Sequence, residues 1–215
     1  MAEIVAILLA AGESRRMGRL KALLSWAGTT LIRHQVAALR EGGADRVVVV
    51  LGHQAPALEQ ELRGLAGVET VLNPDYLQGK TTSIKTGLGK IGLGKTGPGQ
   101  TGLNAVDAAH TEAILLLNVD QPRSADTIRY LLRQHCASNA LITIPTYHDK
   151  GGHPIIFSSL LLGELRQIDE ATEGIRAVVR RHLEATQRVP VENPEVLWDL
   201  NTPEEYAAAL EDGLG

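Results

Sequence analysis

The sequence predicts a three-layer α/β/α domain with a Rossmann-like, mostly parallel sheet. Continuous apolar runs such as 3–10 and 46–51 are typical of strands that are covered on both faces. Amphipathic helical patterns separate these runs, which implies right-handed crossovers between parallel strands. The chain is 44% hydrophobic but only 3% aromatic, so its core must consist mainly of Leu, Ile, Val and Ala. A sheet flanked by helices suits that composition.

The first half of the chain alternates between strand and helix patterns. The first predicted strand covers 3–10, and Gly12 ends the apolar run. A helix then reaches residue 41, capped by Thr29 or Thr30 and stopped by the glycine pair 42–43. The next predicted elements are a strand over 46–51, a helix over 57–64, a strand over 68–72 and a helix over 81–88.

A five-residue glycine repeat then interrupts the pattern from about residue 87 to 111. It has neither a helical nor a strand period, so we expect a flexible surface insertion within a single domain over 1–215. Segment 89–96 matches the phosphate-loop expression G-x-x-x-x-G-K-[ST], but no predicted strand enters it and no helix leaves it. Further strands are predicted over 112–118, 141–145, 154–157, 188–191 and 196–200, and helices over 124–135, 158–166, 172–183 and 203–210.

Charge and composition argue against several classes of protein. The chain has 21 Lys and Arg residues and 25 Asp and Glu residues, which gives a net charge of −4. It therefore lacks the excess of positive charge that would favour binding to nucleic acid or to an anionic membrane. No apolar stretch reaches the ~20 residues of a membrane span, and Glu3 stands where a signal peptide needs basic residues. The single cysteine, Cys136, is expected to be a small buried core residue in a reducing compartment. We therefore expect a cytoplasmic protein.

Small residues and cations follow the first strand. Leu9, Ala10, Ala11 and Gly12 would let a nucleotide triphosphate approach the backbone, and cations near Lys21 could neutralise charge on an α-phosphate and a leaving pyrophosphate. A solvated basic loop, with Lys21 as an exposed side chain, is the alternative. The position favours the anion site, because open α/β sheets bind ligands at the carboxyl ends of their strands.

These residues belong to a longer motif. The run L-A-A-G-E-S-R-R-M-G-R-L-K over 9–21 resembles the signature of the nucleotidyltransferases that make molybdenum-cofactor dinucleotides, in particular the molybdopterin cytidylyltransferase branch. Further similar segments occur in family order at 73–88, 119–122, 152–157 and 199–206, so the resemblance spans almost the whole chain. It implies a fold of the nucleotide-diphospho-sugar transferase type and transfer of CMP from CTP to molybdopterin, with release of pyrophosphate.

The resemblance also implies roles for particular residues. Arg16 and Lys21 match the cations that hold the α-phosphate and stabilise charge as pyrophosphate leaves. Asp120 matches the Mg²⁺-binding aspartate, and Asp199 and Asn201 match the second metal contact. The nucleotide-binding positions are Leu9, Ala10, Ala11, Gly12, Gly79 and Ser83, and the acceptor-binding position is His153.

Some of these residues have a second interpretation. Asp199 and Asn201 would point to the same side of an extended segment, but Asn201 or Thr202 could also cap the following helix. His153 could bind the acceptor as a neutral imidazole or as a cation. The family usually has Gly where this chain has Val119, which would be strained if the position needs a positive φ.

The donor and the acceptor stay open at this point. Ala11 stands where guanylyl-transferring relatives commonly carry Gly, which favours cytosine, with GTP as the alternative donor. A sugar or polyol phosphate is the alternative acceptor. The chain could also be a non-catalytic nucleotide- or cofactor-binding insertion factor for molybdoenzymes. A recipient molybdoenzyme or its chaperone is an expected partner, whereas nucleic acid and membranes are not.

Overall fold

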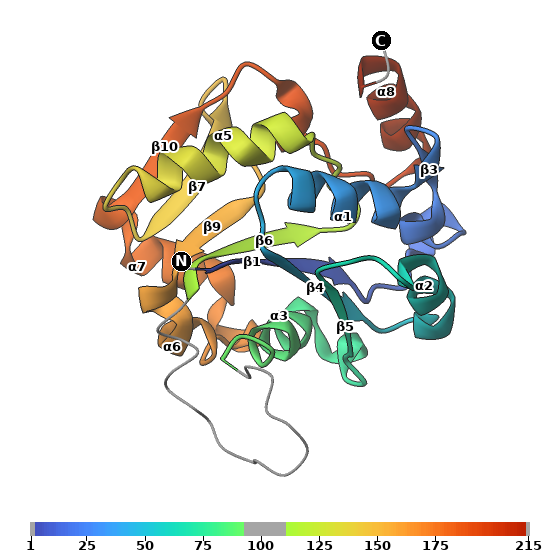
Figure 1. Ribbon diagram of the computed structural model, residues 1–215, viewed down its shortest axis with the longest axis horizontal. Helices are drawn as coiled ribbons and strands as arrows, with labels where there is room; N and C mark the ends of the chain where they lie inside the picture. Colours follow the sequence, from blue (N-terminus) through green and yellow to red (C-terminus); the bar gives the residue numbers. More distant parts are fainter. Residues whose placement is uncertain (1–2, 93–110, 214–215) are drawn as a thin grey trace.

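A sheet of eight strands lies at the centre of the protein (Figure 1). The computed structural model describes residues 3–92 and 111–213, so most of the expected glycine-rich insertion lies outside the described residues. The strands are β1 (Glu3–Ala10), β4 (Arg46–Leu51), β5 (Val68–Leu72), β6 (Thr111–Asn118), β7 (Ile142–Tyr147), β8 (Lys150–Gly151), β9 (Ile155–Ser158) and β10 (Thr186–Pro190). Their order is β10-β7-β9-β6-β1-β4-β5, with β8 beside β7, and only β8 and β9 run antiparallel to their neighbours. The mostly parallel sheet confirms the predicted fold class.

Helices cover both faces of the sheet and complete the three layers (Figure 1). One face carries α1 (Leu31–Glu41), α2 (Ala55–Leu62) and α5 (Ala125–Cys136), and the other carries α3 (Lys80–Leu88), α6 (Leu162–Leu165) and α7 (Ile175–Arg181). Side chains of β1 alternate between the two cores: Ala6 and Leu8 face the first group of helices, and Val5 and Ile7 face the second. All four are fully buried, which explains the continuous apolar run in the sequence.

The glycine repeat begins inside the packed structure. Gly87 lies in α3, and a Cβ atom added there would lie 2.6 Å from Cγ2 of Ile7 and 3.0 Å from Cγ2 of Val50. Glycine therefore allows α3 to approach β1 and β4 closely. Ile91 is also fully buried. The first residues of the repeat thus belong to the packed helix and the turn that follows it, rather than to a surface insertion.

The order of the strands opens a crevice at the middle of the sheet. From β1 the chain adds β4 and β5 on one side, and it then crosses to β6 on the other side of β1. Ligands of open α/β sheets bind at such a switch point, outside the carboxyl ends of the strands. Because β1 ends at Ala10 and β6 ends at Asn118, the predicted nucleotide loop and Asp120 lie at the same edge.

The prediction of a strand over 196–200 is wrong. Pro194–Leu197 forms a turn of 3₁₀ helix, and Asn193 Oδ1 accepts a hydrogen bond from Glu195 N at 3.0 Å at its start. This segment does not join the sheet, because its carbonyl groups bond to a buried arginine, described below.

The prediction that Cys136 is buried is also wrong, because its side chain is exposed. It is the last residue of α5, and His135 takes the last buried position of that helix. The His135 Nδ1 atom lies 2.8 Å from Thr143 Oγ1 of β7, so a buried hydrogen bond links the end of α5 to the sheet.

The last helix, α8 (Pro203–Gly213), is fixed next to the carboxyl edge of the sheet. Thr202 Oγ1 accepts from Glu205 N at 3.2 Å, and Glu205 Oε2 accepts from Thr202 N at 3.0 Å, which is a capping box. Beside α8 in Figure 1 lies a short hairpin of β2 (Ser25–Trp26) and β3 (Thr29–Thr30). The core between them contains Met17, Leu24, Trp26, Leu31, Leu200 and Ala209. Leu200 in this core fixes the flanking residues Asp199 and Asn201.

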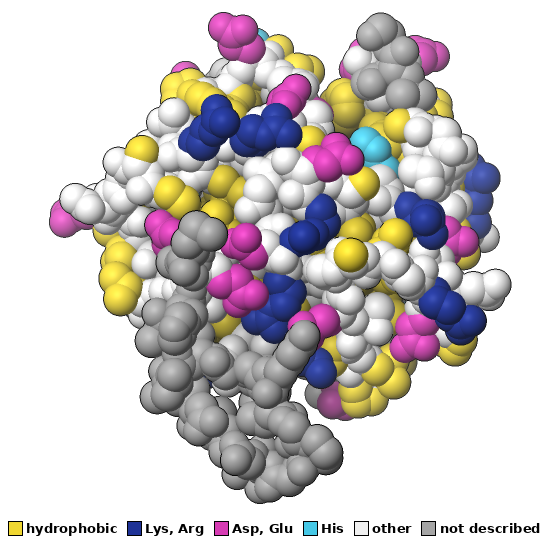
Figure 2. All heavy atoms as spheres, viewed as in Figure 1, with side chains coloured by type: hydrophobic (Ala, Val, Ile, Leu, Met, Phe, Trp, Pro, Cys, Tyr) yellow, Lys and Arg dark blue, Asp and Glu magenta, His cyan; other side chains and the backbone are white. Residues whose placement is uncertain are grey.

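The surface carries both signs of charge. On the face drawn in Figure 2, Lys and Arg side chains lie among Asp and Glu side chains and form no continuous basic field. This face therefore lacks the basic stripe that is typical of nucleic-acid-binding proteins. In the described part of the chain, no helix has the length and apolar character needed to cross a membrane.

A buried arginine ties three separate segments together. The side chain of Arg123 is almost fully buried, at 1% exposure. Its guanidinium donates to the carbonyl oxygens of Pro122 at 2.7 Å, His153 at 2.8 Å, Val196 at 2.9 Å and Trp198 at 3.2 Å. Burial lowers the pKa of Arg123 to about 9, against the effect of nearby Glu195, so the group is still charged at neutral pH. We call these contacts the Arg123 network.

We expect Arg123→Met to lower the free energy of unfolding by about 3–5 kcal/mol, because four buried or partly buried carbonyl groups and Glu195 would lose their cation. Urea unfolding of the variant and the wild type measures the difference. The matched control is Arg133→Met on the exposed side of α5, which should change stability by no more than about 0.5 kcal/mol. Equal stability of the two variants would contradict a structural role for the Arg123 network.

Candidate functional site

A cleft of about 630 Å³ runs along the carboxyl ends of β1 and β6. Its wall is built from the loop after β1, the segment before α3, the turn after β6 and the residues before α8. The predicted site residues that line it are Leu9, Ala10, Ala11, Gly12, Lys21, Gly79, Ser83, Asp120, Asp199 and Asn201. Segments that are far apart in sequence therefore meet at the predicted edge of the sheet.

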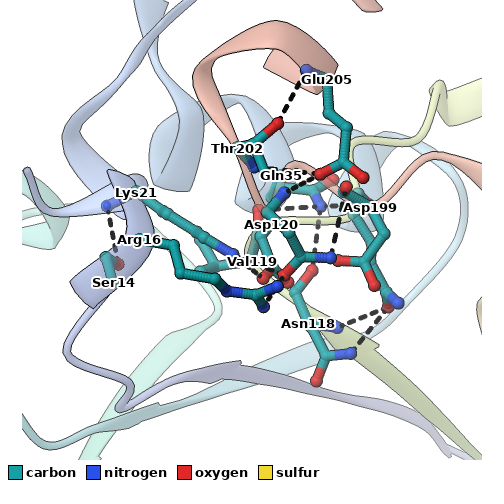
Figure 3. Close-up of polar contacts among 12 residues, drawn as sticks. Ser14, Arg16, Lys21, Gln35, Asn118, Val119, Asp120, Asp199, Thr202 and Glu205 are labelled. Carbon is teal, nitrogen blue, oxygen red and sulfur yellow. Dashed lines mark hydrogen bonds and ion pairs between the residues drawn. The ribbon is translucent and has the colours of Figure 1, made fainter. Parts of the chain in front are cut away.

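Two predicted cations contact two predicted metal ligands here (Figure 3). Lys21 lines the cleft, whereas Arg16 is exposed and is not among the lining residues. Lys21 Nζ donates to Asp120 Oδ2 at 2.7 Å and to Asn201 Oδ1 at 3.0 Å. Arg16 Nη2 donates to the same Asn201 oxygen at 2.9 Å. Both cations thus point at the oxygen atoms of the proposed metal site.

The interpretation of Lys21 as an exposed loop residue is wrong, because Lys21 is only 8% exposed. Its backbone N–H donates to Ser14 Oγ at 3.0 Å, and a 3₁₀ turn over Lys21–Leu23 follows. This turn directs the side chain into the cleft, where Asp120 offsets the cost of burying the charge.

The loop after β1 has an unusual backbone that holds Arg16 in place. Ser14 has φ 55° and Gly18 has φ 64°, and the 3₁₀ turn Arg15–Met17 lies between them. Met17 is buried in the core beside α8, so its neighbour Arg16 faces the residues before α8. A Cβ atom added at Gly12 would meet nothing within 4 Å, which leaves the backbone there open to a ligand.

Val119 causes no strain in the turn before Asp120. Val119 is not among the described residues with positive φ, so the glycine usual in the family is not needed for this backbone. Its N–H donates to Leu9 O at 2.9 Å, and its side chain is buried in the core. Leu200 N donates to Asp120 O at 2.8 Å, which links this turn to the segment of Asp199.

The two carboxylates of the cleft repel each other. Burial raises the pKa of Asp199, and the negative charge of Asp120 raises it further, while Asn201, Lys21 and Lys80 oppose this effect. No group of three His, Cys, Asp or Glu side chains that could hold a metal occurs among the described residues. The candidate set is instead two carboxylates and one amide oxygen, which are donors suited to a hard cation such as Mg²⁺. Additional positive charge at this position would relieve the repulsion.

Residues at the start of α3 form the side of the cleft predicted to meet the base. Gly79 has φ 123°, and a Cβ atom there would lie 2.9 Å from Cδ of Glu170. Ser83 is buried, and its Oγ atom accepts from Asn73 Nδ2 at 2.9 Å. Glu170 accepts from Thr81 N at 3.0 Å. Glu170 and Asn73 were not predicted as site residues. Glu170 bonds to α3 from 89 positions further along the chain, and Asn73 bonds to α3 from the segment that follows β5.

A second cleft of about 610 Å³ adjoins the first. Lys80, Asn118 and Asp199 line both clefts and form a shared wall. The apolar part of the second cleft consists of Ile84, Leu116, Leu117, Ile155 and Ile175. Its polar part includes His153 and Gln121, so the predicted acceptor residue lies across the shared wall from the predicted nucleotide residues.

His153 is neutral in this environment. Burial lowers its pKa to about 4, with further contributions from Lys80 and Arg123, while Asp120 opposes the change. Its Nδ1 atom lies 3.3 Å from Gln121 Nε2. Because the amide nitrogen can only donate, this contact places the ring proton on Nε2. Of the two forms considered from the sequence, the neutral imidazole is therefore the one present at pH 7.

Lys80 and Arg123 are charged residues that the sequence prediction missed. Lys80 follows Gly79 directly, so its position next to a predicted site residue could have identified it. Arg123 follows the predicted metal aspartate by three positions, but its partners other than Pro122 lie 30 to 75 residues away, and no local pattern indicates them.

Comparison with known proteins gives consistent similarities. Residues 6–186 match the family described as MobA-like NTP transferase domain. The chain is 27% identical over 211 residues to the molybdenum cofactor cytidylyltransferase of Escherichia coli (strain K12), covering 98% of this chain and 97% of the relative. It is 29% identical over 187 residues to the nicotine blue oxidoreductase of Paenarthrobacter nicotinovorans, covering 83% of this chain and 82% of the relative.

A solved structure extends the similarity to three dimensions. Rv0371c from Mycobacterium tuberculosis H37Rv has a TM-score of 0.75 and 26% identity, with 98% of each chain covered. The same protein is also known as a complex with manganese, at a TM-score of 0.70 and 26% identity, with 97% of this chain and 98% of that chain covered. The names of the relatives differ in chemistry, so they define a family rather than one activity.

We expect the stability of the protein to decrease as the pH falls from 6.5 to 4, because His153 gains a proton more readily in the unfolded state than in the folded state. The folded pKa is about 4 and the ordinary value is 6.5, so the unfolded state binds more protons between these values. The stabilisation is fully present above pH 6.5 and is lost as the pH falls to 4, by at most about 3 kcal/mol. Urea unfolding between pH 4 and 7 measures it. His153→Gln should flatten this pH dependence and His148→Gln, at an exposed position, should not; parallel curves for His153→Gln and the wild type would refute the assignment.

We expect Lys21→Met to lower the free energy of unfolding by about 1.5–3 kcal/mol, because Asp120 would lose its cation next to Asp199. Thermal or urea unfolding at pH 7 checks this, with Lys85→Met on the exposed side of α3 as the control. If both variants were as stable as the wild type, the Lys21–Asp120 ion pair would not contribute to folding.

Proposed function

This chain belongs to the MobA-like NTP transferase domain family, and from that premise we propose that it transfers CMP from CTP to the terminal phosphate of molybdopterin, releasing pyrophosphate. The observation that carries the proposal is the convergence of Arg16, Lys21, Asp120 and Asn201 at the switch point of the sheet. Similarity over nearly the full length to a relative named molybdenum cofactor cytidylyltransferase supports this donor and acceptor.

The nucleotide would occupy the first cleft. Its triphosphate would follow the loop after β1, where Gly12 leaves the backbone accessible. Its base would lie toward Gly79 and the buried hydroxyl of Ser83, on the opposite wall. Small residues at the end of β1 allow this close approach, as the sequence predicts.

The reaction depends on positioning and charge neutralisation rather than on a covalent nucleophile. An oxygen of the acceptor phosphate forms a bond to the α-phosphorus of CTP while the bond from that phosphorus to the pyrophosphate oxygen breaks. Arg16 and Lys21 would bind oxygens of the α-phosphate and stabilise the charge that develops there. Lys21 would exchange its bond to Asp120 for a bond to phosphate, so that its charge stays paired throughout.

Mg²⁺ is the cofactor we propose, held by Asp120, Asp199 and Asn201. When bound, it would supply positive charge to the phosphate oxygens and the leaving pyrophosphate. Burial raises the pKa of Asp199, and repulsion from Asp120 raises it further, which supports a cation site here. The manganese complex of a structural relative supports a divalent metal. With the metal in place, Lys21 would be free to act on the nucleotide.

The acceptor would occupy the second cleft. The apolar side chains of this cleft suit the face of a flat heterocycle, and the polar edge of that heterocycle could bond to His153 and Gln121. The phosphate of the acceptor would reach the nucleotide at the shared wall of Lys80, Asn118 and Asp199. We also propose that the product passes to a recipient molybdoenzyme or its chaperone, since the finished cofactor must be inserted after synthesis.

Pyrophosphate release tests the proposal. The protein is incubated with molybdopterin and each of the four nucleoside triphosphates, with Mg²⁺, Mn²⁺ or EDTA. We expect release with CTP that EDTA abolishes. Lys21→Met should reduce turnover about 100-fold or more, because it removes a cation from the developing charge, and Lys85→Met should not.

Other outcomes would identify the alternatives. Turnover with GTP in place of CTP would make the chain a guanylyltransferase. Turnover of CTP only with a sugar or polyol phosphate would replace the acceptor. Nucleotide binding without turnover of any triphosphate would contradict an enzyme and favour a binding factor for molybdoenzymes.

A further inference from the structure

Two cations of the second cleft have no partner within the described chain. Lys80, the first residue of α3, and Arg176, near the start of α7, both line this cleft. Neither side chain forms an ion pair or a hydrogen bond with any other residue in 3–92 or 111–213. Lys21 in the first cleft and the nearby Arg16, in contrast, are bonded to Asp120 and Asn201.

The carboxylates around these two cations are already engaged elsewhere. Glu170 accepts hydrogen bonds from both the backbone N–H and the hydroxyl of Thr81. Glu173 forms an ion pair with Arg180 on the outer side of α7. The third carboxylate, Asp199, belongs to the proposed metal site. The lining of this cleft therefore carries three carboxylates beside the two cations, but none of the three bonds to Lys80 or Arg176.

The two cations are close enough to affect each other. Desolvation lowers the pKa of Lys80, and the positive charge of Arg176 lowers it further, while Asp120, Asp199 and Glu170 raise it. Like charges that face one cleft without a bonded partner favour the binding of an anion between them. Arg176 can present two parallel N–H groups and Lys80 a compact ammonium, which is a combination suited to phosphate oxygens.

The place of Lys80 fixes where such an anion would lie. Lys80 is part of the wall that the two clefts share, together with Asn118 and Asp199. An anion bound by Lys80 in the second cleft therefore lies next to the first cleft. A phosphate that attacks the α-phosphorus of a nucleotide must occupy this boundary, where it would otherwise be repelled by the charge of the triphosphate and of Asp199.

We propose that Lys80 and Arg176 form a clamp for the phosphate monoester of the acceptor, a site that rests on the function proposed above. The clamp holds the attacking phosphate at the boundary of the two clefts and offsets its repulsion from the donor. His153 and Gln121 have a different task in the same cleft. A neutral imidazole and an amide offer hydrogen bonds without charge, so they recognise the uncharged part of the acceptor.

Binding of inorganic phosphate tests the clamp without the acceptor. Saturating α,β-methylene-CTP with Mg²⁺ fills the first cleft, and ³¹P line widths report phosphate bound elsewhere. Lys80→Met and Arg176→Met should each weaken phosphate binding roughly 10- to 100-fold, the loss typical of a charge-assisted hydrogen bond. Lys85→Met and Arg133→Met are the controls, since both residues are exposed cations of the same types outside the cleft. Lys80→Arg should retain part of the binding.

Steady-state kinetics gives the second measurement. The clamp predicts a similar rise in KM for molybdopterin in Lys80→Met and Arg176→Met, with the melting temperature unchanged. KM for CTP should stay unchanged in Arg176→Met, because Arg176 lines the second cleft and not the first. A merely structural role would change all of these together.

The outcomes separate the clamp from the proposed function. If phosphate binding falls in both variants but the wild type does not act on molybdopterin, the proposed function fails and the anion site stands. If the wild type transfers CMP but both variants keep wild-type phosphate binding and acceptor KM, the clamp is wrong and the function stands. A wild-type protein that binds no phosphate in the presence of the CTP analogue would also overturn the clamp.

Discussion

The buried guanidinium of Arg123 is the interaction on which both clefts depend. It bonds to carbonyl oxygens of the turn after β6, of the segment before β9 and of the segment before α8. Asp120 lies two residues from one of these carbonyls, Asp199 lies one residue from another, and His153 itself provides a third. One side chain thus sets the relative position of the proposed metal ligands and of the proposed acceptor residue. A cation can do this where an apolar side chain could not, because the carbonyl groups of these irregular segments have no sheet or helix to satisfy them.

The acidic net charge is compatible with binding a triphosphate because the local arrangement of charge matters more than the total. At rest, Lys21 and Asp120 neutralise each other inside the cleft, so a lysine with 8% exposure is tolerated. In the proposed reaction, the same pair would provide an anion-binding cation and a cation-binding carboxylate once a metal and a phosphate separate them. The protein therefore keeps the charges needed for nucleotide transfer close together without leaving either one buried alone.

The sequence predicts those parts of the structure whose cause is local. Strands β1, β4 and β5 have the predicted bounds, because each is an apolar or β-branched run between turn residues. The motif over 9–21 locates the loop after β1 and its carboxyl-edge position for the same reason. Long-range contacts account for what was missed. Residues 196–200 have a strand-like composition, but Arg123 takes up the carbonyl groups that a strand would use. The burial of Lys21 depends on Asp120, 99 residues away, and no local pattern contains that information.

The start of α3 explains why side-chain cations are needed between the clefts. Free N–H groups at the first turn of a helix are natural partners for phosphate, and α3 begins in the shared wall. Here, however, Glu170 already accepts from Thr81 N, and Gly79 lets the carboxylate approach because a Cβ atom would lie within 2.9 Å of it. This carboxylate fixes the helix and the adjacent base-side residues, but it also occupies the site that a phosphate could have used. An anion at the boundary must then be bound by side chains that extend past Glu170, and Lys80 and Arg176 are the cations in position to do so.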